Sequence, residues 1–147
     1  NAVMVDVTAK DETVRVAKAA CSVIMSPDTV AAISDARIKK GDVLSIAQLA
    51  GIMGAKKTAD LIPLCHPLPL TSSQVELAIN VERNGIDIVS TCKITGRTGV
   101  EMEALTAVSV AALTVYDMCK AIDRAIRITD IRLIHKSGGK SGTYDAA

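Results

Sequence analysis

Alternating apolar and polar residues predict β-strands near the start and at the end of this chain. Residues 13–25 are rich in side chains that favour extended backbone, and Val14 and Val16 alternate there with Arg15. This pattern indicates a first strand. Residues 126–135 show a similar preference and predict the last strand.

The middle of the chain carries the clearest local signal, that of a β-hairpin. Apolar residues alternate with polar ones over 75–82, and the alternation resumes over 86–94. Asn84 and Gly85 lie between the two runs, and this pair favours the positive φ angles of a two-residue hairpin turn. We therefore expect two antiparallel strands joined by a tight turn at these two residues.

Two helices are predicted between the first strand and the hairpin. Residues 26–28, Ser-Pro-Asp, combine an N-cap, a proline at the first helical position and an acid in the first turn, which predicts a helix to about Arg37. Asp42 can cap a second helix, whose apolar residues recur at helical spacing until Pro63 ends it. Three prolines then make residues 63–69 a stiff, non-helical segment.

A long helix and a glycine-rich tail complete the pattern. Residues 98–101, Thr-Gly-Val-Glu, have the spacing of a capping box and predict a helix to about Asp123. The chain ends in a Gly/Ser/Lys tail from about residue 136, which we expect to be flexible. The element order β-α-α-β-β-α-β predicts a single α+β domain over 1–147, a ferredoxin-like split βαβ arrangement with an antiparallel sheet and helices on one face.

Composition and charge exclude several classes of function. The chain has 147 residues, of which 49% are hydrophobic and 22% charged, so it is not disordered. No uninterrupted apolar run approaches the ~20 residues of a membrane span. A formal net charge of +1 and the absence of Trp and Phe disfavour a nucleic-acid binder, which needs a basic surface or stacking aromatics. We therefore expect neither nucleic acid nor membrane as a partner.

Cysteine usage points to a reducing compartment. The four cysteines form no C-x-x-C pair and only two histidines are present, so we expect no structural zinc site and no bound metal. Unpaired thiols with apolar neighbours are typical of the cytosol. We therefore expect a cytoplasmic protein.

The proline-rich segment holds the first candidate for chemistry. His66 stands between prolines on a stiff loop, so it has little freedom, which suits a side chain that must point at a substrate. The alternative is that His66 only satisfies a loop carbonyl and that Cys65 is a small buried hydrophobe.

Acidic residues at both ends of the long helix are further candidates. The helix dipole and the capping box explain Glu101, whereas Glu103 precedes an apolar stretch and is either functional or paired with Lys93 or Arg97. Asp117, with Lys120 three positions later, could act as a general acid or base whose charge the lysine controls. The alternative is a surface pair worth about 0.2–0.5 kcal/mol.

Lysines and glycines form a candidate anion site. Glycine lets backbone amides approach an anion while lysines supply charge, although the spacing is not that of a phosphate-binding P-loop. The lysines in question are Lys39, Lys40, Lys56, Lys57, Lys136 and Lys140. The alternative is that the tail is merely mobile.

The spacing of the two helical acids bears on where a pocket can be. Glu103 and Asp117 are 14 positions apart, about 21 Å along an unbroken helix. Both cannot line one small pocket within one subunit unless the substrate is long. If both are catalytic, we expect a pocket shared between two chains.

Four stretches of this sequence closely resemble one known family: residues 41–68, 98–106, 116–120 and 136–142. The likeness extends over nearly everything from Met4 to Gly142. The family is that of cyclic pyranopterin monophosphate synthase, the molybdenum cofactor biosynthesis accessory protein C. The resemblance implies a ferredoxin-like subunit in a hexamer, a trimer of dimers, with active sites at subunit interfaces.

The resemblance also implies a reaction. The substrate would be 3′,8-cyclo-7,8-dihydroguanosine triphosphate, which a radical S-adenosylmethionine enzyme makes from GTP, and the products would be cyclic pyranopterin monophosphate and pyrophosphate. Such a lyase would need no cofactor of its own, apart from Mg²⁺ that can accompany a triphosphate.

By resemblance, roles fall on particular residues. Asp117 is the implied catalytic acid/base with Lys120 beside it, and Lys40 and His66 are further catalytic groups. Implied substrate contacts are Leu64, Cys65, His66, Glu101, Met102 and Glu103. Lys40, Lys136 and Lys140 would contact the triphosphate, and Arg15 would join them.

A second class of function uses the same residues. A non-catalytic nucleotide-binding or assembly module on this fold could employ the lysines without any demand for acid/base chemistry. The substitution Asp117→Asn separates the two hypotheses. If Asp117 is catalytic, the variant should lose turnover and still bind the substrate.

Overall fold

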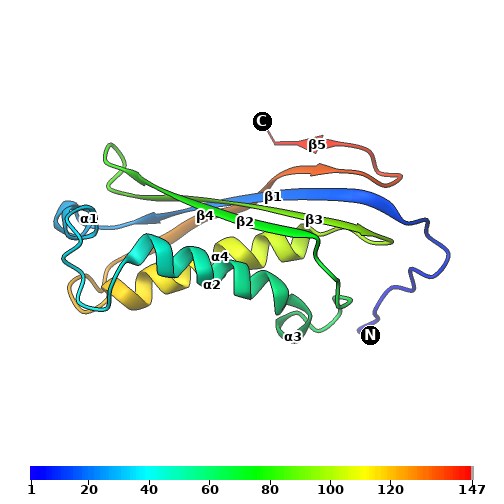
Figure 1. Ribbon diagram of the computed structural model, residues 1–147, viewed down its shortest axis with the longest axis horizontal. Helices are drawn as coiled ribbons and strands as arrows, with labels where there is room; N and C mark the ends of the chain where they lie inside the picture. The colour runs from blue at the N-terminus through cyan, green and yellow to red at the C-terminus, as the bar shows by residue number, and fades with distance from the viewer. Residues whose placement is uncertain (147) are drawn as a thin grey trace.

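Strand β1 (Thr13–Ile24) is the central strand of a five-stranded antiparallel sheet (Figure 1). The computed structural model describes residues 1–146. Across the sheet the order is β2-β3-β1-β4-β5, and every pair of neighbours is antiparallel. The other strands are β2 (Ser72–Asn80), β3 (Gly85–Gly96), β4 (Arg127–Ser137) and β5 (Tyr144–Asp145).

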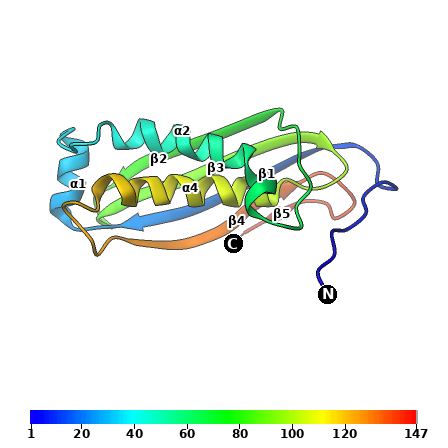
Figure 2. The same cartoon turned by 90° about the horizontal axis from the view of Figure 1, so that it is seen from below.

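The helices lie over one face or at one end of this sheet, and none of the helices in the described residues lies on the other face (Figures 1 and 2). They are α1 (Pro27–Ser34), α2 (Val43–Lys56), α3 (Thr58–Leu61) and α4 (Glu101–Cys119). The predicted order and the α+β, ferredoxin-like class are confirmed, with the short α3 and β5 added. The glycine-rich tail is the turn between β4 and β5, and the Lys136 backbone pairs with Tyr144.

Small residues let α2 and α4 pack closely on each other and on the sheet. A Cβ atom on Gly51 of α2 would lie 2.9 Å from the Ala107 carbonyl oxygen, and one on Gly54 would lie 2.8 Å from a Val110 methyl group. Any larger residue at these positions would push the helices apart. A core without Trp or Phe is thus filled by close approach of backbones.

Helix α4 is long and apolar enough by composition alone to cross a membrane, with a mean hydropathy of 1.3. In this fold 56% of that stretch is buried, and α4 packs against β1 and β3 in the protein core. A buried core helix of a globular domain has this same composition.

The predicted N-caps of the first two helices are present, whereas the helices end earlier than predicted. The side chains of Ser26 and Asp42 accept backbone N–H groups at the starts of α1 and α2. Helix α1 ends at Ser34 rather than near Arg37, because Ala36 adopts a φ of 55° and the Arg37 N–H bonds back to the Ala32 carbonyl, as in a Schellman motif.

The second and the long helix are also shorter than predicted. Helix α2 stops at Lys56, where the Lys57 N–H bonds to the Gly54 carbonyl and the Thr58 hydroxyl bonds to the Ala55 carbonyl. Helix α4 stops at Cys119 rather than Asp123, because the backbone turns away over the next residues.

The hairpin is confirmed, but its predicted two-residue turn is wrong. Asn80 pairs with Gly85, so four residues, 81–84, form the loop. Asn84 has the expected positive φ, 53°. The Asn80 side chain accepts the Arg83 N–H at 3.1 Å, and this local bond favours the wider loop.

Candidate functional site

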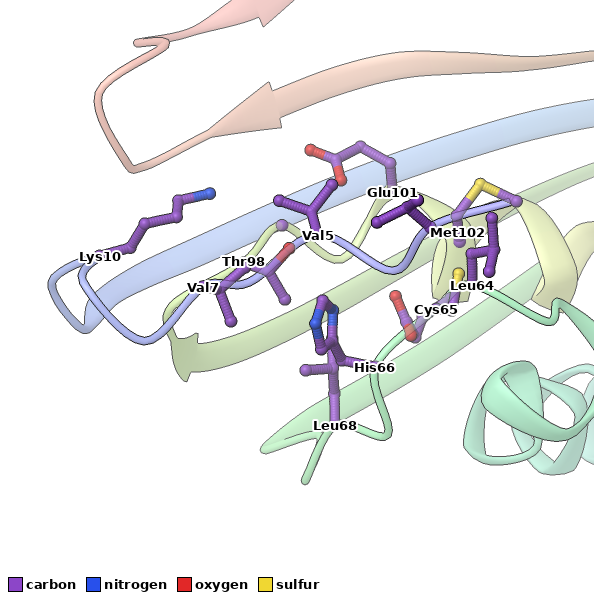
Figure 3. A pocket seen from close by; sticks show the side chains of 13 residues that line it. Val5, Val7, Lys10, Leu64, Cys65, His66, Leu68, Thr98, Glu101 and Met102 are labelled. Atoms are coloured by element: carbon purple, nitrogen blue, oxygen red, sulfur yellow. The ribbon is translucent and has the colours of Figure 1, made fainter. Parts of the chain in front are cut away.

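A pocket of about 370 Å³ lies at the end of the sheet where α4 begins (Figure 3). The N-terminal segment, the proline-rich loop and the β3–α4 turn form its walls. Figure 3 shows side chains converging on it from these three segments, among them Val5, His66 and Glu101. Of the predicted substrate contacts, Leu64, Cys65, His66, Glu101, Met102 and Glu103 all line it.

The proline-rich loop places Cys65 and His66 half-buried at this pocket. The Cys65 N–H bonds to the Ile62 carbonyl, and Thr71 bonds to the Lys93 carbonyl of β3, so the loop is held at both ends. Burial, followed by the nearby Glu103 carboxylate, raises the pKa of the Cys65 thiol. Cys65 therefore stays protonated at neutral pH and is no nucleophile in this state.

Glu101 forms an ion pair across the site rather than the predicted capping box. The N-cap of α4 is Val100, with no side-chain cap, so the prediction of a Thr98 cap is wrong. The Glu101 carboxylate instead lies 2.9 Å from the Lys136 ammonium of β4. A Cβ atom on Gly99 would meet this carboxylate at 2.3 Å, so glycine leaves room for the pair.

Glu103 is buried at the base of the pocket, with 4% of its surface exposed. The alternative of a surface pair with Lys93 or Arg97 is wrong, because Glu103 forms no ion pair with any residue in the described chain. Burial raises the pKa of this carboxyl, and the neighbouring Glu101 charge adds to the rise. Glu103 therefore holds a proton to a higher pH than an ordinary glutamate.

A smaller cavity of about 170 Å³ beside this pocket is rich in cations. Arg15 is 7% exposed, and its Nε donates to the Gly96 carbonyl at 2.9 Å. Gly139 has a φ of 76°, and a Cβ atom there would meet Arg15 Nη1 at 2.3 Å. Lys10 and Lys140 add two more cations to the lining, and Asp11 adds one acid. Buried guanidinium, lysines and left-handed glycine backbone together suit an anion.

Asp117 lies at the opposite end of α4, in a cluster with two lysines. Its carboxylate lies 2.9 Å from the Lys120 ammonium and 3.1 Å from the Lys40 ammonium, which also donates to the Asp117 carbonyl at 3.3 Å. These hydrogen bonds, that of Lys120 first, lower the pKa of Asp117, while the Asp117 carboxylate raises the pKa of Lys120. The cluster is about half exposed, so it is more than the predicted helical pair and faces outward.

One chain therefore separates the predicted residues into two groups. The pocket and its cationic neighbour hold Leu64, Cys65, His66, Glu101, Met102, Glu103, Lys136, Arg15 and Lys140. Lys40, Asp117 and Lys120 form the other group, at the far end of α4. The described residues contain no group of three or more His, Cys, Asp or Glu side chains that could hold a metal ion.

Sequence reasoning missed the N-terminal wall of the pocket. Val3, Val5 and Val7 line it together with Lys10, and Thr98 lines it from the β3–α4 turn. Three valines at every second position were the available signal, but this run is too short to indicate where an isolated segment lies.

Fold and site together define a small ferredoxin-like α+β protein with a cation-flanked pocket at one end of its sheet. The chain belongs to the MoaC family, which it matches over residues 4–139. It is 65% identical over 147 residues to a protein of Rhodospirillum rubrum named cyclic pyranopterin monophosphate synthase, covering 100% of this chain and 89% of the relative.

Other relatives carry the same name. One from Dinoroseobacter shibae is 62% identical over 143 residues, covering 97% of this chain and 90% of the relative. One from Thermoanaerobacter sp. is 56% identical over 142 residues, with the same two shares. The family resemblance of the sequence is thereby confirmed.

Proposed function

We propose that this chain is a cyclic pyranopterin monophosphate synthase of molybdenum cofactor biosynthesis. It would convert 3′,8-cyclo-7,8-dihydroguanosine triphosphate to cyclic pyranopterin monophosphate and pyrophosphate. The full-length match to relatives of this name carries the proposal. The pocket supports it, because six of the implied substrate contacts line this one pocket at one end of the sheet.

Two adjoining cavities suit the two halves of such a substrate. The larger pocket, lined by His66, Met102 and Glu103, has room for the fused rings. The triphosphate would extend toward Arg15 and Lys140, where a buried guanidinium can bind two phosphate oxygens at once. Lys136 stands near both, paired with Glu101.

Two carboxyl groups with opposite pKa shifts would divide the proton transfers. Two lysines lower the pKa of Asp117, whose carboxylate would accept a proton, whereas burial raises the pKa of Glu103, which would donate one. A substrate oxygen that loses its proton would attack the α-phosphorus, and the bond from that phosphorus to pyrophosphate would break. Lys40 and Lys120 would stabilise the charge that develops there.

These groups can meet only between two chains, and the exposed face of α4 offers the contact. Met102, Ser109 and Leu113 lie on this face with Asp117 at helical spacing, along a mainly apolar groove of about 520 Å³. Residue 110 is midway between Glu103 and Asp117. Two antiparallel α4 helices related by a two-fold axis at residue 110 would therefore place Asp117 of one copy beside Glu103 of the other.

A hexamer built as a trimer of dimers needs a second surface. Helix α2 presents Ile46, Leu49 and Met53, which are 40%, 58% and 58% exposed, as one apolar stripe. We propose this stripe as the contact between dimers.

The wider setting follows from the same chemistry. A radical S-adenosylmethionine GTP cyclase would supply the substrate, and both enzymes would work in the cytoplasm. The reaction needs no external oxidant or reductant, so we propose no cofactor for this chain. Any Mg²⁺ would arrive bound to the triphosphate of the substrate.

Direct turnover tests the proposal. Purified protein is mixed with the cyclised GTP intermediate, and pyrophosphate and the pterin product are followed by mass spectrometry. Formation of both in equal amounts supports the synthase, with Asp117→Asn as the inactive control. If wild-type protein binds the intermediate but leaves it intact, the chain is a nucleotide-binding module instead.

A further inference from the structure

Asp123 lies outside the residues assigned so far, in the loop between α4 and β4. One carboxylate oxygen accepts the Ser26 N–H at 2.9 Å and the Thr29 hydroxyl at 2.9 Å. The other accepts the Ala125 N–H of its own loop at 3.1 Å. A single side chain thus joins the loop after α4 to the start of α1.

We propose that Asp123 is a positioning residue that sets the distance between Lys40 and Asp117. Its catalytic consequence rests on the proposed function, whereas its effect on the geometry of the Lys40–Asp117 pair does not. The argument has two sides, because Asp123 is tied both to the segment that carries Lys40 and to the segment that carries Lys120.

On the first side, α1 and the loop that follows it form one hydrogen-bonded unit. The loop after Ser34 is closed by bonds from Arg37 N–H to the Ala32 carbonyl and from Gly41 N–H to the Ile38 carbonyl. Asp123 holds the beginning of this unit, and Lys40 at its end reaches Asp117. A rotation of α1 would therefore move Lys40.

On the second side, Lys120 is the first residue after α4 and starts the loop that contains Asp123. The Ile122 and Asp123 N–H groups both bond to the Cys119 carbonyl, so this loop folds back tightly on the helix end. Thr29 is 1% exposed, which makes the contact point on α1 a rigid one. The Asp123 carboxylate thus braces the two segments that bring lysines to Asp117.

The pKa of Asp117 reports whether Lys40 is held in place. Lys120 faces Asp117 from its own helix end and Lys40 faces it from the loop before α2, and both lower its pKa. Tyr116 is the remaining titratable neighbour of Lys120. If Lys40 withdraws, one of the two cations is lost and the pKa of Asp117 rises toward its ordinary value.

Nuclear magnetic resonance titration of the Asp117 side-chain carboxyl in the full chain tests the proposal. We expect Asp123→Ala and Thr29→Val to raise the pKa of Asp117, while Thr29→Ser, which keeps the hydroxyl, leaves it unchanged. The double variant should match Asp123→Ala alone, because Asp123→Ala already removes the bond that the Thr29 hydroxyl donates to this carboxylate. Asp60→Asn, on α3 and remote from both, is the matched acid control.

Turnover adds a second readout. We expect the two disruptive variants to lower kcat by about 10- to 100-fold with KM within about threefold, because they displace a catalytic group without touching the substrate pocket. An unchanged Asp117 pKa in folded Asp123→Ala and Thr29→Val protein would overturn the proposal. If Asp123→Ala does not fold, the comparison of Thr29→Val with Thr29→Ser tests the proposal. A wild-type protein without turnover would contradict the proposed function alone, since the titration still tests the bracing.

Discussion

The Lys136 ammonium on β4 lies 2.9 Å from the Glu101 carboxylate at the start of α4, and both side chains are little more than a quarter exposed. This pair joins strand β4 to the first turn of α4, which lines one side of the pocket. The pair also holds Lys136 against Glu101, a residue of the pocket lining. A long-range ion pair thus holds the start of α4, which has no side-chain N-cap.

Lys136→Met should lower the free energy of unfolding by about 1–2 kcal/mol, because it leaves a half-buried carboxylate without its charged partner. Urea unfolding followed by circular dichroism measures this loss. Lys57→Met is the matched control, since Lys57 pairs with Asp60 at 4.0 Å and both are more than 70% exposed. We expect almost no change for it. Equal losses in the two variants would show that the Glu101 pair contributes nothing special.

Glu103→Gln should make the protein more stable at neutral pH and leave stability unchanged in acid. Burial raises the pKa of Glu103 in the folded state, so the folded chain binds this proton more tightly than the unfolded chain. The unfolding free energy therefore falls as pH rises through the folded-state pKa. Each unit of that rise corresponds to about 1.4 kcal/mol.

Unfolding of wild type and Glu103→Gln at a series of pH values measures the difference. It should be largest above the folded-state pKa and vanish below about pH 4, near the ordinary pKa of a glutamate. Glu76→Gln, on an exposed position of β2, serves as control and should follow wild type throughout. A wild type more stable than Glu103→Gln at pH 7 would mean that the ionised carboxylate has a favourable partner.

Gly139→Ala should weaken anion binding more than Gly142→Ala does. Both glycines have positive φ, 76° and 71°, so alanine costs about 1 kcal/mol of backbone strain at either. Only at Gly139 would the new Cβ also meet Arg15, whereas nothing lies within 4 Å at Gly142. Calorimetric titration with inorganic pyrophosphate should show weaker binding for Gly139→Ala alone. Equal affinities would remove Arg15 from the anion site.

Much of this fold could be predicted because its signals are local. The caps at Ser26 and Asp42 and the alternation of the hairpin strands depend on neighbouring residues. The capping box at Glu101 failed because a strand more than thirty residues away supplies a stronger partner, Lys136. The hairpin turn failed for the opposite reason, since a local bond to Asn80 outweighed the Asn-Gly preference.

The sequence indicated which residues belong to the candidate site, but not which of them lie in contact. Motif likeness indicated Asp117 and Glu103, and helix arithmetic placed them at opposite ends of α4. Nothing in the sequence pattern indicated that Lys40, from a loop 77 positions away, would join Asp117. Contacts between segments far apart in the chain depend on packing, which no local pattern encodes.

Asp117→Asn should reduce kcat by about 10²- to 10⁴-fold, the usual contribution of a general acid or base. Substrate affinity should change little, because a general acid or base lowers the barrier to proton transfer and does not hold the substrate in the ground state. Product formation and equilibrium binding of the cyclised intermediate measure the two effects. Asp60→Asn is the exposed-acid control. A variant that keeps its turnover would remove Asp117 from the mechanism.

A mixture of two inactive variants should regain activity if each site takes Glu103 from one chain and Asp117 from the other. Asp117→Asn and Glu103→Gln each damage every site of their own homo-oligomers. In a random mixture half of the dimers contain one chain of each kind, and each such dimer has one intact site and one doubly damaged site. Activity should therefore return to about a quarter of the wild-type value.

Subunit exchange can be ensured by producing the two variants together from one cell, with different tags to isolate the mixed species. A matched mixture of Asp117→Asn with Lys120→Met should stay inactive, because both residues belong to the same cluster of one chain and every site of a mixed dimer then lacks one of them. Recovery in the first mixture and none in the second places the site between chains. If neither mixture recovers although mixed species form, the 21 Å separation along α4 is not bridged by a second copy, and Glu103 and Asp117 do not serve one site.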